Sequence, residues 1–156
     1  MKKIYTLVLC WMTTTVMATD IDERKILLLN EMQRHHILTE MRALLLGTQQ
    51  ILHALSEDDM LAVSRHARML GMEMAHTGEN HLQSVLPEDF MQLGVSVHKS
   101  FDQIAADAET LKNPKRTLTQ LSATMQRCVA CHAAYQIQTT DLPAEAEAHP
   151  AHHKHH

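Results

Sequence analysis

The sequence predicts an all-α protein, folded as an up-down-up-down antiparallel four-helix bundle. Leu, Ala, Met and Gln are plentiful, whereas aromatic residues make up only 3% of the chain, and this composition favours helices over strands. Four amphipathic segments follow one another with start and stop signals between them, and no alternating strand pattern separates them. The connections between these segments are short, which favours antiparallel neighbours.

The first two expected helices span residues 21–55 and 56–76. Asp20 and Glu23 have the spacing of a capping box at the start of the first helix. Its predicted buried stripe consists of Met41, Leu44, Leu45, Thr48, Ile51, Leu52 and Leu55. Ser56 and Asp59 restart the chain as a second helix, which residues 77–80 interrupt after His76. The face predicted to be buried there carries Met60, Val63, Ala67, Leu70, Gly71 and Met74.

The third and fourth expected helices span residues 87–111 and 114–138. Pro87 is a favourable first helical residue, and Glu88 and Asp89 follow where the helix dipole favours acidic groups. The third helix is expected to bury Phe90, Leu93, Val97, Phe101, Ile104, Ala108 and Leu111. Asn113 and Pro114 mark the start of the fourth helix. Its apolar face is expected to carry Leu118, Leu121, Met125, Cys128, His132 and Tyr135.

The beginning of the chain indicates export. Lys2 and Lys3 precede an apolar run that closes on small residues, so residues 1–18 are predicted to be a secretory signal peptide cut after Ala18. We expect a periplasmic protein whose membrane contact is through this signal only. Removing the two lysines moves the formal net charge from −4 to −6 (−4 minus 2), which argues against a nucleic-acid partner.

The mature chain is expected to form one domain, residues 19–138, followed by a disordered His-rich tail, residues 139–156. The tail contains the histidine cluster His149, His152, His153, His155 and His156, which could bind nickel, copper or zinc. Two of the three cysteines remain after export, Cys128 and Cys131, so a four-cysteine zinc site is excluded.

The two remaining cysteines lie in the stretch Cys-Val-Ala-Cys-His, residues 128–132. Cysteines at i and i+3 with histidine at i+4 can supply two thioether bonds to one haem and an axial nitrogen for its iron, which is the signature of c-type haem attachment. A thioredoxin-like dithiol would need a preceding strand and a βαβ neighbourhood. A zinc site would need two more ligands, which could only be histidines from elsewhere in the fold. The motif therefore favours one covalently bound haem c.

The position of the motif in the last of four helices resembles the class II c-type cytochromes, the cytochrome c-prime group of four-helix bundles. The resemblance covers about residues 21–138 and rests on the Cys-Val-Ala-Cys-His motif, the following Tyr135 and four helices of fitting length. It implies that Cys128 and Cys131 carry the thioethers and that His132 is the proximal iron ligand.

This resemblance also implies a function. We expect a one-electron carrier that exchanges electrons with periplasmic redox partner proteins and is not an enzyme. Relatives often pair, so a homodimer is an option that the sequence leaves open. Family members with an open sixth position instead bind small gases, so a five-coordinate binder of nitric oxide or carbon monoxide is the alternative. A periplasmic metal-handling protein that uses the His-rich tail is the second alternative.

The sixth iron ligand decides between the first two functions. Counting along antiparallel first and fourth helices places residues 37–41 opposite His132, at a rise of about 1.5 Å per residue. Met41 lies on the expected buried stripe and would complete a Met/His pair, which raises the reduction potential. The alternative is that Met41 only packs in the core. Met32 is the runner-up, and Ile37 or Leu38 facing an open site would give the gas-binding form.

Several other residues attract attention but are expected to have ordinary roles. His35 and His36 are expected at the surface or the haem edge, and His98 is expected to be half-buried. Helical spacing scatters a possible soft-metal group, composed of His66, Met69, Met72, Met74 and His76. Arg34 and Arg127 could each pair with a haem propionate, although arginines so placed usually face solvent.

Overall fold

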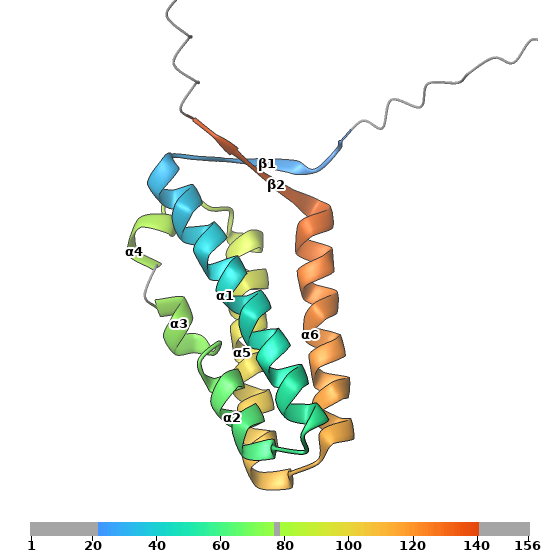
Figure 1. Cartoon of the computed structure of the whole chain (residues 1–156). Helices are drawn as coiled ribbons and strands as arrows, with labels where there is room; N and C mark the ends of the chain where they lie inside the picture. Colours follow the sequence, from blue (N-terminus) through green and yellow to red (C-terminus); the bar gives the residue numbers. More distant parts are fainter. Residues whose placement is uncertain (1–21, 77–78, 141–156) are drawn as a thin grey trace, which may run out of the picture.

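The protein is mostly helical, as the sequence predicts. The computed structural model describes residues 22–76 and 79–140, so the predicted signal peptide and residues 141–156 of the predicted His-rich tail lie outside the described residues. Three long helices run beside one another in Figure 1: α1 (Glu31–Ser56), α5 (Glu88–Leu111) and α6 (Pro114–Ala134). A shorter helix, α2 (Met60–Arg68), packs against both α1 and α5, and α5 in turn packs against α6.

The structure contains two short strands that the sequence did not predict. Within the described residues, β1 (Lys25–Leu29) and β2 (Tyr135–Thr139) form a parallel pair in which Lys25 is opposite Tyr135. Figure 1 shows this pair lying across one end of the long helices. Leu27 and Leu29 are buried while Ile26 and Leu28 are exposed, which is the period of two that a strand requires.

The predicted boundaries of the first helix are therefore wrong at its start. Its first turn is fixed by Asn30, whose side chain accepts a hydrogen bond from the Gln33 backbone N at 2.9 Å, while the Gln33 side chain accepts one from the Asn30 backbone N at 3.0 Å. This is a capping box ten residues later than expected. Asp20 lies outside the described residues, and Glu23 precedes β1.

The second predicted helix is interrupted. After α2, residues 69–71 leave the helix, and two short helices follow, α3 (Met72–His76) and α4 (Glu79–Leu82). Asp102 on α5 explains the interruption, because its Oδ2 accepts a hydrogen bond from the Met72 backbone N at 3.0 Å. A Cβ at Gly71 would collide with the same carboxylate, so glycine allows the close approach.

The third and fourth helices begin near their predicted starts. Pro87 is the residue before α5, and the Asn113 side chain caps α6 by accepting a hydrogen bond from the Arg116 backbone N at 3.1 Å. However, α6 ends at Ala134 and not near residue 138, because the chain becomes β2. Its buried face is also rotated from the prediction: Leu118 and Met125 are exposed, whereas Thr117, Leu121 and Thr124 are buried.

The core consists of two hydrophobic clusters stacked along the helices. The first cluster joins α1, α2, α5 and α6 and includes Ile51, Val63, Phe101, Ile104 and Leu121. The second cluster lies under the strands and includes Leu27, Leu29, Ile37, Leu82, Leu86 and Tyr135. Met41 packs against both clusters, so it marks the level at which they meet. No helix of the described residues is long and apolar enough to cross a membrane.

Candidate functional site

The last two turns of α6 position the Cys-Val-Ala-Cys-His motif. Cys128 packs against the first core cluster and Cys131 against the second. Both cysteines are free and only half-buried. Partial burial raises the pKa of both thiols, and the neighbouring Cys128 raises that of Cys131 further. The motif thus presents two neutral thiols one helical turn apart.

His132 lies at the rim and not on the inward face. It is exposed, although it lines the same hollow as the two cysteines. The guanidinium of Arg24 donates a hydrogen bond to the His132 backbone oxygen at 3.4 Å, which connects the segment before β1 to the motif. The expectation of an inward face is therefore correct for the cysteines and wrong for the histidine.

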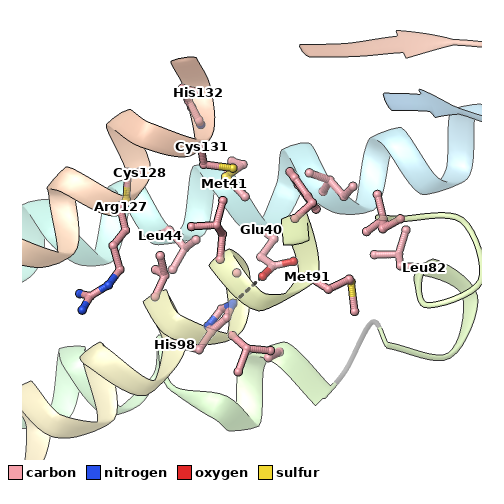
Figure 2. Close-up of a pocket in the computed structure, with 18 of the residues that line it drawn as sticks. Glu40, Met41, Leu44, Leu82, Met91, His98, Arg127, Cys128, Cys131 and His132 are labelled. Carbon is pink, nitrogen blue, oxygen red and sulfur yellow. Dashed lines mark hydrogen bonds and ion pairs between the residues drawn. The ribbon is translucent and has the colours of Figure 1, made fainter. Parts of the chain in front are cut away.

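The cysteines open onto a mainly apolar hollow between α1, α5 and α6 (Figure 2). The hollow is partly open to solvent, and its cavity volume is about 110 Å³. Cofactor sites typically have about 300–1,000 Å³. The side chains that line the hollow would therefore have to separate to admit a group as large as haem.

Met41 lines this hollow from α1. Figure 2 shows Met41 on α1 and Cys131 on α6, and both line the hollow. The buried Ile37, one turn earlier on α1, lines it too. Met32, in contrast, is 65% exposed and does not line it, nor does Leu38. The structure thus brings Met41 and Ile37 to the motif and leaves the runner-up methionine away from it.

A buried histidine beside the hollow was not recognised as a paired group from the sequence. His98 on α5 is 2% exposed; its Nδ1 lies 2.8 Å from the Leu70 backbone oxygen and its Nε2 lies 2.7 Å from Glu40 Oε1. Burial acts to lower the pKa of His98, but the hydrogen bonds to Glu40 and Leu70 outweigh it, so the pKa is raised. Glu40 directly precedes Met41, and only the fold shows that it meets His98 (Figure 2).

Of the other residues that the sequence singled out, some lie at the hollow and others lie away from it. Arg127 lines the hollow and donates a hydrogen bond to Ser100 Oγ at 3.0 Å, whereas Arg34 is exposed and does not line it. The break between α2 and α3 separates His66 from Met74, which packs against the first core cluster. Among the described residues, no group of three or more His, Cys, Asp or Glu side chains is arranged to hold a metal ion.

Comparison of the chain with protein-family models, with curated proteins and with solved structures finds no match. The functional argument therefore rests on the residues of this chain and on their placement.

Proposed function

We propose that the protein is an exported c-type cytochrome that holds one covalent haem and carries single electrons between periplasmic partners. The observation that supports the proposal is the position of the motif: Cys128, Cys131 and His132 line an apolar hollow whose opposite wall includes Met41. A redox dithiol would need a βαβ neighbourhood, and the described residues form a helical protein with one two-stranded parallel pair.

The residues around the hollow fit a haem chemically. Cys128 and Cys131 would hold the group by thioethers, and the imidazole of His132 and the thioether of Met41 would bind its iron. When bound, the haem supplies a one-electron redox couple at its iron. The apolar lining, which includes Leu44, would exclude water and so tune the potential.

The helix packing supports the finer expectation of a four-helix bundle. α1 packs on α2, α2 on α5, and α5 on α6, which is the order of neighbours that an up-down-up-down chain produces. The fold would then be a bundle of these four helices, with α3 and α4 as an excursion between the second and third. The haem would lie toward the end that β1 and β2 cross.

Absorption spectroscopy of the oxidised and reduced protein tests the proposal. The protein is produced with a haem maturation system, and we expect a red-region sulfur-to-iron band in the oxidised wild type that Met41→Ala removes. Met91→Ala is the matched control, because Met91 lines the same hollow from α5. The control should keep the band.

Other outcomes of this experiment are equally informative. A high-spin spectrum that Met41→Ala leaves unchanged and that carbon monoxide shifts would replace the electron carrier by the gas-binding form, with Ile37 facing the open position. Absence of covalently bound haem after maturation would reject both forms. Loss of the band in the Met91 variant alone would assign the axial thioether to α5.

A further inference from the structure

A second hollow adjoins the first on α1 and gathers a different set of side chains. It is lined by residues of α1, by Met74 of α3 and by His81 of α4. His36 and Glu40 line both hollows, so α1 separates them. Within this second hollow lie two imidazoles, those of His36 and His81, and two thioethers, those of Met32 and Met74.

The two imidazoles are held close together. Their ring centroids are 5.1 Å apart and the ring planes meet at 87°. Two imidazole nitrogens that each lie about 2 Å from one metal ion place their ring centroids roughly 5–6 Å apart. The pair therefore already has a separation that a shared ion requires. The contact is positioned by Gln33, whose Nε2 donates a hydrogen bond to the His81 backbone oxygen at 3.4 Å.

One of these imidazoles has an unused ligand atom. The Nε2 of His81 is buried and has no hydrogen-bond partner. Buried polar atoms are nearly always paired, so an unpaired one calls for an explanation. A metal ion that accepts the lone pair of this nitrogen would supply the missing partner.

The ligand types indicate which metal would bind. Imidazole with thioether suits the soft cuprous ion, whereas zinc and harder ions are usually held by three or more His, Cys or carboxylate groups. Such a group of three is absent from the described residues. The nearest carboxylate, that of Glu40, has its Oε1 2.7 Å from His98 Nε2, and its Oε2 lies 4.0 Å from His36 Nε2.

We propose that His36, His81 and Met32 bind one copper(I) ion in this second hollow, with Met74 as a further thioether ligand. Met32 is 65% exposed, so its long side chain can turn toward the two imidazoles without disturbing the core. The site is distinct from the His-rich tail and does not depend on the presence of haem.

Copper binding to the full-length chain tests the proposal. Because the tail histidines would bind copper themselves, they are all replaced by asparagine in the background chain, at positions His149, His152, His153, His155 and His156. The two free thiols are also strong copper(I) ligands, so the background chain carries Cys128→Ala and Cys131→Ala as well. The protein is dialysed under anaerobic, reducing conditions against copper(I), and bound copper is counted by atomic absorption. We expect one ion per chain, and at least tenfold weaker binding in His36→Ala and in His81→Ala.

The matched control is His53→Ala, which removes an exposed histidine near the other end of α1. This variant should retain the ion with unchanged affinity. Met32→Leu changes only an exposed side chain and should weaken copper(I) binding without altering the helical circular dichroism, so it keeps the test valid if a histidine variant fails to fold.

Three results would overturn the site: no retained copper in the background chain, equal retention in His36→Ala and the control, or tighter binding of zinc than of copper(I). None of these results bears on the covalent haem, because the count of copper is made independently of the haem spectrum. Failure of the copper site and failure of the proposed cytochrome function are therefore distinguishable.

Discussion

At the residue scale, the buried His98 and its partner Glu40 form a polar pair beside the hydrophobic core. The imidazole is held at both nitrogens, by Leu70 and by Glu40, and therefore has its hydrogen-bonding capacity satisfied. Because removing one partner of a buried pair leaves the other desolvated and unpaired, such pairs are sensitive to substitution. The pair also fixes α5 against α1 beside Met41.

Glu40→Gln should destabilise the protein in a pH-dependent way. Hydrogen bonds raise the pKa of His98 above its ordinary value of 6.5, so the pair contributes stability that is fully present below that value and is lost as pH rises through the folded pKa. We expect a loss of about 1–3 kcal/mol near pH 5.5 and a smaller loss near pH 9. Urea unfolding at both pH values measures the difference.

The exposed Glu57 provides the control for this substitution. Glu57→Gln should change the free energy of unfolding by less than about 0.5 kcal/mol at either pH. His36, whose Nε2 is 4.0 Å from the second oxygen of Glu40, is present in both variants. An equal loss for Glu40→Gln at both pH values would contradict the charged pair and leave only a neutral hydrogen bond.

At the element scale, the strand pair links the two ends of the helical part. β1 precedes α1 and β2 follows α6, so their pairing joins segments more than 100 residues apart. Leu27 and Leu29 direct the buried face of β1 into the second core cluster, and the Tyr135 ring meets Phe90 of α5 edge-on at 5.2 Å between centroids. The strands thereby cover the end of the protein at which the motif lies.

Two neighbouring leucines of β1 test whether the strand packs against the core, because one is buried and the other is exposed. Leu29 is 1% exposed and Leu28 is 61% exposed. Leu29→Ala should cost about 2–5 kcal/mol, because it leaves a cavity in the second cluster, whereas Leu28→Ala should cost less than about 1 kcal/mol. Urea unfolding curves measure both values, and similar costs for the two variants would mean that β1 does not pack as described.

The break between α2 and α3 yields a prediction on two glycines. Gly71→Ala places a methyl group against the Asp102 carboxylate that caps α3, and should cost about 1–3 kcal/mol through overpacking and loss of the cap. Gly94 lies inside α5, and apart from its chain neighbours and the nearby backbone of α5 no atom lies within 4 Å of a Cβ built there. Gly94→Ala should therefore stabilise the protein by about 0.5–1 kcal/mol. Thermal unfolding of both variants checks the opposite signs.

At the scale of the whole molecule, the sequence predicted those features that depend on residues close together in the chain, such as helix caps. Asn113 caps α6 as expected, since a cap and its helix are adjacent in the chain. The expected start of the second helix at Ser56 is wrong, because Ser56 ends α1 and Asp59 caps α2. The strands were missed because β1 pairs with a partner at the far end of the chain, and its five residues continue the apolar pattern of a helix. The copper ligands were missed for the same reason, because His36 and His81 meet only after folding.

The site around the motif likewise combines features that follow from residue spacing with contacts that form only when the chain folds. The spacing of Cys128, Cys131 and His132 alone predicts a covalent haem, and this stays a prediction. Helix rise and the expected buried stripe of the first helix together placed Met41 opposite the motif, and Met41 lines the same hollow. The pairing of Glu40 with His98 left no local signal, since an acidic residue one position before the buried stripe would ordinarily face solvent.

The hollow lies where the two core clusters meet, which has a consequence for the stability of the whole protein. Residues 82–86, which link α4 to the start of α5, contribute Leu82 and Leu86 both to the second cluster and to the wall of the hollow. Because this wall borders empty space on the side of the hollow, it should open at lower free energy than the first cluster. A ligand that binds only the folded protein should then suppress that opening.

Hydrogen exchange measured by mass spectrometry tests this consequence. We compare the haem-loaded protein with the Cys128→Ala, Cys131→Ala double variant, which has no thiol to attach the group. Peptides that cover residues 79–91 should exchange at least tenfold more slowly in the loaded protein, because the attached haem would fill the space beside Leu82 and Leu86. Peptides around Phe101 and Ile104, which are buried in the first cluster, should change much less. Equal slowing of both regions would mean that the protein opens as one cooperative unit, and no slowing in residues 79–91 would place the haem outside this hollow.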